Sequence, residues 1–258
     1  MSGLVTAVGS RIRALWQPPA VETALLAWYA EHGRDLPWRR TRDPYAILVS
    51  EVMLQQTQVA RVIPRWQAWL RRWPTVETLA AASAADVIRA WQGLGYNRRA
   101  VHLHGAASSV AAQGWPDDLT ELPGVGRYTA DAVAAFAFGR DVLPVDTNVR
   151  RVLERTGGTF GATSAQALFD LGATVCLARI PRCGVCPLAG DCPSRGRRYA
   201  PLRKQSRFEG SFRQRRAALL KLVAGGAQPL VEVDAEAVES LRRDGLVVVA
   251  DGLVALPA

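Results

Sequence analysis

All four cysteines of this 258-residue chain lie close together, at Cys176, Cys183, Cys186 and Cys192. Nothing else in the chain could pair with them, and a cytosolic protein is not expected to rely on disulfides, so they favour a shared metal site. Zinc usually takes paired C-x2-C motifs, whereas the spacing here is an uneven C-x6-C-x2-C-x5-C. This spacing favours a 4Fe–4S cluster, in which each iron needs one thiolate. Zinc, or clustered cysteines without a ligand, are the alternatives.

Basic residues surround the cysteines, and Asp191 is the only acidic residue among them. They are Arg179, Arg182, Arg195, Arg197, Arg198, Arg203, Lys204 and Arg207. A rigid loop rich in arginine is typical of a phosphate-binding surface, and a solvated charged loop is the alternative. The whole chain has a net charge of +9 and a pI of about 10.1. This charge indicates a polyanionic partner, most commonly nucleic acid, although a generic basic protein has it too.

Glu51 is the first candidate for acid–base chemistry. It falls in a predicted helix that begins at Asp43-Pro44, an N-cap followed by proline, and runs through Leu54. Ile47 and Leu48 lie one turn before Glu51, so its carboxyl projects near an apolar face. Such surroundings are expected to raise the pKa of the carboxyl, which suits a general acid near neutral pH. An ordinary surface glutamate is the alternative.

Asp146 is the second candidate, in the segment Leu143-Pro-Val-Asp-Thr-Asn-Val149 just before a predicted helix. A helix N-cap would account for an aspartate at this position. The functional alternative is an ionised carboxylate that stabilises an oxocarbenium-like sugar. Glycosidic cleavage commonly uses one protonated and one ionised carboxyl group, and an N-glycosidic bond poses the same electrostatic problem. Glu51 and Asp146 are the candidates for these two roles.

A glycine-rich turn, Leu122-Pro-Gly-Val-Gly126, precedes an Ala- and Val-rich predicted helix over Tyr128–Phe138. Gly124 and Gly126 permit a tight hairpin, which leaves the backbone amides of the next helix facing outward. Such amides bind a phosphate without reading base sequence. The pattern is typical of a helix–hairpin–helix motif, and a plain helix–helix connection is the alternative.

The elements that must position these residues are mostly helices joined by short loops. Besides those named above, the predicted helices are Val21–Glu31, Ala60–Trp73, Ala84–Gln92 and Arg98–Ala112. Strand signals are scarce over this part of the chain. The predicted fold class is therefore all-α, with a domain over residues 20–202 that includes the cysteine loop over residues 176–192.

The C-terminal residues 208–258 follow a different pattern, after a predicted linker over Arg203–Gly210. Two predicted helices, Phe212–Val223 and Asp234–Arg243, precede two short strands that flank Asp251-Gly252, a good hairpin turn. The strands are predicted over Leu246–Val249 and Leu253–Leu256. This arrangement resembles a small α+β winged helix. Its first helix carries Arg213, Arg215 and Arg216, which we expect to hold phosphates.

Several motifs taken together resemble the helix–hairpin–helix glycosylases of the endonuclease III-like superfamily, and above all the A/G-specific adenine DNA glycosylase branch. They are Ser50-Glu-Val-Met-Leu-Gln-Gln-Thr-Gln-Val59, Gly93-Leu-Gly-Tyr96, Leu122-Pro-Gly-Val-Gly-Arg-Tyr-Thr129, Val145-Asp-Thr-Asn-Val149 and the four-cysteine loop. The likeness spans roughly Leu26 to Cys192. It implies a two-lobed helical fold, a 4Fe–4S cluster held by the four cysteines, and a double-stranded DNA partner with mismatched or damaged base pairs.

The same resemblance implies roles for individual residues. Glu51 would protonate the adenine, Asp146 would stabilise the sugar cation, and Tyr128 and Asn148 would help to hold them. The residues implied to contact DNA are Gln55, Gln56, Thr57, Tyr96, Gly124, Gly126 and Arg127. Among these, Gln56 and Tyr96 would fill or wedge the duplex beside the extruded base. The residues that fall where the family builds its adenine pocket are Arg34, Leu36 and Trp38.

The resemblance also bears on the fate of the DNA strand. Endonuclease III-type relatives carry a lysine nucleophile in the hairpin, where this chain has Tyr128. Because no lysine precedes Lys204, we expect base hydrolysis without an efficient strand-cleaving step. The predicted function is thus a monofunctional base-excision-repair glycosylase for adenine opposite 8-oxoguanine or guanine. The alternatives are a glycosylase for thymine or uracil opposite guanine, and a non-enzymatic iron–sulfur DNA-binding protein.

The remaining expectations concern the chain as a whole. Many members of this family end in a nudix-like domain that reads 8-oxoguanine, and the C-terminal module is too short for one, so a short form is expected. The N-terminal Met1–Trp16 resembles neither a signal peptide nor a membrane anchor. We therefore expect a cytoplasmic, bacterial, nucleoid-associated monomer without a membrane partner.

Overall fold

Helix α2 (Pro44–Leu54) begins where the sequence predicts, because Asp43 caps it. The Asp43 carboxylate accepts hydrogen bonds from the backbone N–H groups of Tyr45 at 3.0 Å and Ala46 at 3.3 Å. All side chains from Tyr45 to Met53 are buried, so α2 is packed on every side and has no wet face. This computed structural model describes residues 18–200 and 207–258. The predictions on Met1–Trp16, Arg203 and Lys204 lie outside these ranges.

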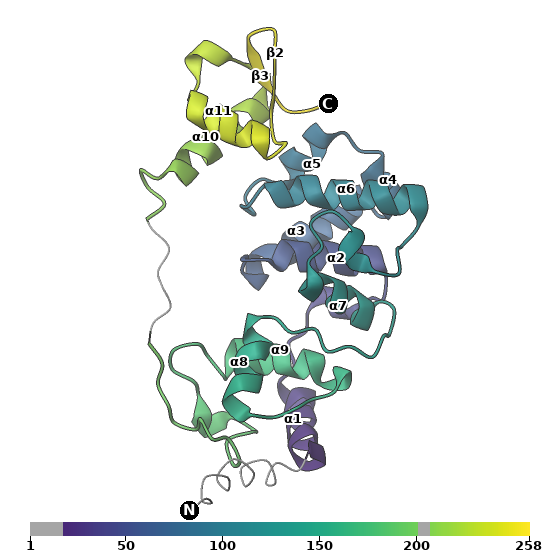
Figure 1. Cartoon of the computed structure of the whole chain (residues 1–258), viewed down its shortest axis with the longest axis vertical. Helices are drawn as coiled ribbons and strands as arrows, with labels where there is room; N and C mark the ends of the chain where they lie inside the picture. Colours follow the sequence, from purple (N-terminus) through teal and green to yellow (C-terminus); the bar gives the residue numbers. More distant parts are fainter. Residues whose placement is uncertain (1–17, 201–206) are drawn as a thin grey trace, which may run out of the picture. The chain divides into compact units, whose positions relative to one another are not determined.

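The central helix α2 belongs to a unit made of Leu36–Gly139 and Gln205–Ala258, which we call the hairpin unit. Within it, α2 packs against α3, α6 and α7 (Figure 1). The helices before the C-terminal module are η1 (Pro37–Arg40), α3 (Val59–Arg72), α4 (Val76–Ala80), α5 (Ala84–Trp91), α6 (Arg98–Gln113), η2 (Leu119–Glu121) and α7 (Arg127–Phe136). The sequence analysis missed α4, whose N-terminus is closed by a capping box in which the hydroxyls of Thr75 and Thr78 each accept a hydrogen bond from the other residue's backbone N–H.

The second unit, which we call the cysteine unit, combines Met1–Asp35 with Arg140–Lys204. Its described helices are α1 (Pro18–His32), α8 (Thr147–Thr156), η3 (Ala162–Ser164), α9 (Ala165–Thr174) and η4 (Cys183–Val185). Although α1 is far from α8 and α9 in the sequence, Leu25 of α1 shares one apolar core with Val152 and Leu168. This packing joins the N-terminal helix to the segment that carries the cysteines (Figure 1).

The C-terminal module contains α10 (Phe212–Gly225), η5 (Leu230–Glu232), α11 (Ala235–Arg243) and a sheet of order β1-β3-β2. Its antiparallel strands are β1 (Gln228–Pro229), β2 (Val248–Ala250) and β3 (Leu253–Ala255). The predicted helices and hairpin are confirmed, and Asp251 and Gly252 both have positive φ values, 50° and 73°, as a tight hairpin turn requires. The sequence analysis missed β1. The module's apolar core includes Ile88 of α5, so it packs on the helical part of its own unit.

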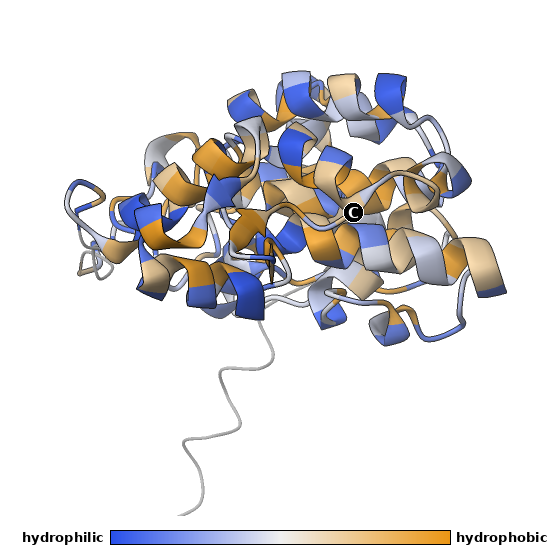
Figure 2. Ribbon diagram, turned by 90° about the horizontal axis from the view of Figure 1, so that it is seen from above, coloured by the Kyte–Doolittle hydropathy of each residue, from blue (hydrophilic) through white to orange (hydrophobic). Residues whose placement is uncertain are grey.

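The all-α class with a small α+β module is thus confirmed for the described residues. Figure 2 shows that most helices carry both apolar and polar residues, as expected for helices that pack around a core. Among the described helices, none is long and apolar enough to cross a membrane.

Candidate functional site

Glu51 and Tyr128, both predicted as catalytic residues, are brought together in the hairpin unit. Glu51 lies on α2 and is only 6% exposed. The Tyr128 hydroxyl, from the first turn of α7, donates a hydrogen bond to Glu51 Oε2 at 2.8 Å. The surface-glutamate alternative is therefore wrong. A buried carboxyl next to a hydroxyl donor can hold or release a proton at one defined atom.

The hairpin before α7 has the backbone that its glycines were predicted to permit. Gly124 has a φ of +74°, and a Cβ at this position would lie 2.5 Å from the Cβ of His102 on α6. Gly126 is the N-cap of α7, and no side chain caps this helix. The N-cap therefore offers no side-chain acceptor to the first backbone N–H groups of α7, and Arg127 beside them is exposed. A helix N-terminus of this kind favours an anion such as a phosphate.

Two loops of the hairpin unit carry exposed side chains on strained backbone. Gln56 follows α2 with a φ of 55°, and Tyr96 precedes α6 with a φ of 46°. A left-handed conformation costs a residue other than glycine about 1–2 kcal/mol, so the surrounding structure must hold both loops. Gln55 and Thr57 flank Gln56, and Gln55 Nε2 donates to Thr129 Oγ1 at 3.4 Å. The predicted DNA-contacting residues thus all lie in one unit, on the hairpin and these two loops.

Asp146, in the cysteine unit, is the N-cap of α8. Its carboxylate accepts hydrogen bonds from the backbone N–H groups of Asn148 at 2.8 Å and Val149 at 2.6 Å. The Asn148 side chain donates a further bond to it from Nδ2, at 2.8 Å. The capping role foreseen for Asp146 is confirmed, and the same three donors and the helix N-terminus stabilise negative charge on the carboxylate.

Arg151 is a residue that the sequence analysis missed. It lies one turn after Asn148 on α8 and donates from Nη2 to Asn148 Oδ1 at 2.8 Å and to the Gly172 carbonyl at 2.7 Å. Its Nε donates to the carbonyl of Cys176 at 2.8 Å. One guanidinium therefore orients the amide that binds Asp146 and also holds the backbone at the first cysteine. Spacing on a predicted helix could have paired Arg151 with Asn148, but nothing local predicts the contacts to Gly172 and Cys176.

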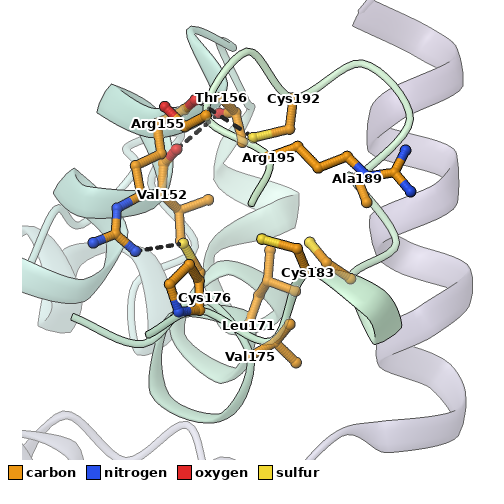
Figure 3. A pocket seen from close by; sticks show the side chains of 13 residues that line it. Val152, Arg155, Thr156, Leu171, Val175, Cys176, Cys183, Ala189, Cys192 and Arg195 are labelled. Carbon is orange, nitrogen blue, oxygen red and sulfur yellow. Dashed lines mark hydrogen bonds between the residues drawn. The ribbon is translucent and has the colours of Figure 1, made fainter. Parts of the chain in front are cut away.

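The four cysteines line one pocket, together with apolar side chains such as Val152 and Leu171. Figure 3 shows Cys176, Cys183 and Cys192 around this pocket. Burial raises the pKa of the Cys186 thiol to about 11, and burial also raises the pKa of Cys192.

The donors in this pocket are four cysteine thiols, with no histidine or carboxylate among its lining residues. Among the described residues, no group of three or more Cys, His, Asp or Glu side chains is arranged to hold a single metal ion. Thiolates on one zinc lie about 2.3 Å from the metal and are crowded together, whereas a cubane holds one thiolate at each of four irons. Four thiols that line one pocket fit a cluster that needs one thiolate at each of four irons.

Arg155 closes this pocket from α8. It is 7% exposed and donates to the carbonyls of Leu177 at 2.7 Å and Ala178 at 2.6 Å. Its Nη1 also lies 3.5 Å from the Cys176 Sγ (Figure 3). The Arg155 guanidinium stacks on Tyr199. The sequence analysis missed Arg155 as well. The arginines of the loop that are exposed, as a phosphate-binding surface requires, are Arg179, Arg182, Arg195, Arg197 and Arg198.

The three residues predicted for the base pocket are divided between the units. Arg34, in the cysteine unit, donates from its backbone N and from Nε to the fully buried Asp170, both at 2.7 Å. Leu36 and Trp38 are buried in the hairpin unit, where Trp38 packs edge-on against Trp66. Glu51 and Asp146 likewise belong to different units. The adenine pocket stays a prediction.

Two of the three arginines expected to hold phosphates on the C-terminal module are used within it. Arg215 forms ion pairs with Asp234 and Glu236, both at 2.7 Å. Arg216 pairs with Asp244. These acidic partners lie on or beside α11, so the two guanidinium groups join α10 to α11. Both guanidinium groups are therefore engaged within the module, and their contact with phosphates stays a prediction.

Comparisons with known proteins agree with this geometry. The model of the HhH-GPD superfamily base excision DNA repair proteins matches residues 49–172. The chain is 44% identical, over 287 aligned residues, to the adenine DNA glycosylase of Mycobacterium tuberculosis (strain ATCC 25618 / H37Rv), covering 92% of this chain and 93% of that one. It is similar to a thermostable thymine-DNA glycosylase structure, with 27% identity and a TM-score of 0.61 over 67% of this chain and 94% of the other. A non-covalent endonuclease III–DNA complex, 22% identical, shares the fold with a TM-score of 0.59 over 67% and 92%.

Proposed function

The chain belongs to the adenine DNA glycosylases of the HhH-GPD superfamily of base excision DNA repair proteins, and we propose that it removes adenine mispaired with 8-oxoguanine or guanine. The observation that carries the proposal is the buried Glu51 carboxyl, hydrogen-bonded to Tyr128 directly after the hairpin. Adenine is the base named for the relative that is 44% identical over almost the whole chain. Thymine is named for a structure only 27% identical to this chain, so adenine is the better supported base.

In the proposed reaction, one carboxyl group acts on the base and the other on the sugar of the bond that breaks. Glu51 gives its proton to the adenine, so the base leaves with the bonding electron pair as a neutral molecule. Asp146 remains ionised and stabilises the oxocarbenium-like sugar, and water then adds to the sugar carbon and loses a proton. Tyr128 holds the Glu51 carboxyl and Asn148 holds that of Asp146, each at 2.8 Å.

The product is an intact strand with an abasic site. A strand-cleaving relative needs an amine that attacks the sugar carbon and forms an imine. Tyr128 stands at the position where those relatives carry lysine, and the only lysines of the chain are Lys204 and Lys221. The proposal is therefore monofunctional hydrolysis.

The four cysteines and their pocket would hold a 4Fe–4S cluster, which would fix the arginine-rich loop as a surface for the DNA backbone. Arg155 and Arg151 hold the backbone from Cys176 to Ala178 at one side of this pocket. Purified protein should contain iron and absorb broadly near 400 nm, and Cys183→Ser should lose both properties. One zinc per chain and no iron would refute this part of the proposal.

A panel of duplexes tests the base preference. Single-turnover incubations with A:8-oxoguanine, A:G, A:C, T:G and U:G duplexes would be followed by alkaline cleavage of abasic sites. We expect release of adenine opposite 8-oxoguanine and guanine, loss of release in Glu51→Gln, and normal release in Glu77→Gln, an exposed glutamate of the same unit. Release of thymine or uracil without adenine would show that the base is assigned wrongly. Release of no base, with duplex binding intact, would favour the non-enzymatic alternative.

A further inference from the structure

Arg99, on the first turn of α6, is a buried cation whose contacts are almost all backbone carbonyls. The residue is only 9% exposed. Nη1 donates to the carbonyls of Val52 and Gln55, both at 2.6 Å, and also reaches the carbonyl of Met53 at 3.2 Å. These acceptors lie at the C-terminal end of α2 and in the turn that follows it. This edge of the guanidinium therefore holds the segment that presents Gln56.

The other edge of the same guanidinium holds the second loop. Nη2 donates to the carbonyls of Gly95 at 3.0 Å and Leu94 at 3.3 Å, and Nε lies 3.4 Å from the carbonyl of Tyr96. Nη2 also donates to Thr57 Oγ1, at 3.2 Å, so the first loop is contacted from both edges. One rigid planar group thus joins the two segments that surround Gln56 and Tyr96.

Ion pairing does not explain why Arg99 is buried. Among the described residues, no carboxylate pairs with Arg99, and burial lowers its pKa to about 10. Its guanidinium also lies over the rings of Trp91 and Tyr96, with centroids 5.2 Å and 5.6 Å from the guanidinium carbon. Burying an arginine without a counter-ion is unfavourable unless its donors are satisfied, and here carbonyls from the two loops satisfy them. Some of these carbonyls also have local donors, such as Trp91 Nε1 for Gly95 at 3.1 Å and Thr57 Oγ1 for Gln55 at 3.3 Å. Removing Arg99 would leave only these local bonds and would take away the one group that joins the left-handed backbone of both loops.

We propose that Arg99 is a positioning residue that holds the Gln56 and Tyr96 loops in one arrangement, ready to enter the duplex beside the extruded base. This inference rests on the proposed function, since it assigns a task to residues that would wedge the DNA. It concerns the opening of the base stack and not the bond cleavage that follows. Extruding a base requires unstacking it, and side chains held in place before binding lose less conformational entropy when they insert.

The test compares Arg99→Met and Arg99→Lys with Leu79→Ala, which removes a fully buried side chain on α4, outside the two loops, and should lower stability. Extrusion is measured as the fluorescence rise of 2-aminopurine opposite 8-oxoguanine on binding, beside affinity for mismatched and matched duplexes and thermal unfolding. We expect Arg99→Met to lose most of the fluorescence rise and to slow single-turnover base release by about tenfold or more, with nearly unchanged matched-duplex affinity. Arg99→Lys should be intermediate, because one ammonium cannot reach both loops at once.

The outcomes separate this inference from the proposed function. Wild-type release of adenine tests the function by itself, and extrusion can be followed whichever base is released. A normal fluorescence rise in folded Arg99→Met would overturn the inference, as would an equal loss in Leu79→Ala at the same melting temperature. If Arg99→Met does not fold, Arg99→Lys is measured instead. A folded Arg99→Lys with wild-type extrusion, or a second failure to fold, would show that Arg99 serves folding alone.

Discussion

Arg151 binds Asn148 at 2.8 Å and, with the same guanidinium, the Cys176 carbonyl at 2.8 Å. The amide group that Arg151 orients is the one that donates to Asp146. A residue at the edge of the cysteine pocket is thus joined to the proposed catalytic carboxylate through two side chains of α8. The orientation of an amide is otherwise free to reverse, so the position of the Arg151 guanidinium decides which end of Asn148 faces Asp146.

We therefore expect Arg151→Met to slow single-turnover base release by about tenfold, because Asn148 would no longer present Nδ2 firmly to Asp146. Mismatched-duplex affinity should change much less. The control is Arg150→Met, which removes the exposed arginine next to it on α8. Equal slowing in both variants would mean that the loss of positive charge, and not the orientation of Asn148, is responsible.

The Glu51–Tyr128 pair predicts a graded loss of rate. Glu51→Gln removes the proton donor and should lower base release by about a hundredfold or more, with binding of the mismatched duplex retained. Tyr128→Phe removes only the hydroxyl that holds this carboxyl, so we expect about a tenfold loss. Both rates are measured under single-turnover conditions with binding followed separately. A loss in Tyr128→Phe as large as that in Glu51→Gln would indicate that the hydroxyl itself takes part in the reaction.

The two glycines of the hairpin should respond differently to alanine. Gly124→Ala places a methyl group on a left-handed residue and against His102, and it should lower the free energy of unfolding by roughly 2–4 kcal/mol. Gly126 has a φ of −84° and open space around it, so Gly126→Ala should leave stability nearly unchanged. Denaturant unfolding of the two variants checks this. Similar stability of both would show that the hairpin can move away from α6.

Local signals account for the parts of the fold that the sequence predicted. Asp43-Pro44 is recognisable because a cap and a first-turn proline act within a few residues, and Asp251-Gly252 because a tight turn needs left-handed backbone. The short helix α4 was missed because its capping box joins two threonines and has no glutamate. The two-residue strand β1 carries no pattern long enough to recognise.

The arginines show what one sequence could not predict. Arg98 and Arg99 are adjacent and identical in type, yet the first is exposed and the second is buried against two loops. The difference arises from the packing of α2 on α6, which no local pattern encodes. Arg151 and Arg155 likewise find their carbonyl acceptors more than 20 residues away. Residues with intrinsic chemistry, such as Glu51, could be found from type and spacing, whereas the arginines that hold the surrounding backbone could not.

The last prediction concerns which arginines hold the DNA backbone. Each guanidinium that contacts a phosphate releases counterions on binding, so its removal lowers the salt dependence of affinity by about one unit in the log–log slope. Arg215 is held by Asp234 and Glu236, whereas Arg179 in the cysteine loop is exposed. We expect Arg179→Met to reduce this slope. Arg215→Met should leave the slope unchanged and instead lower the stability of the C-terminal module, because two ion pairs between α10 and the start of α11 are lost.

The measurement is duplex affinity at several salt concentrations, together with thermal unfolding of each variant. Both variants remove one positive charge, so a general effect of net charge would appear equally in the two. Equal losses of slope would therefore mean that Arg215 leaves its acidic partners to bind phosphate and that the module contacts DNA. A loss confined to Arg215→Met would place the phosphate contact on the module and remove the argument for the cysteine loop.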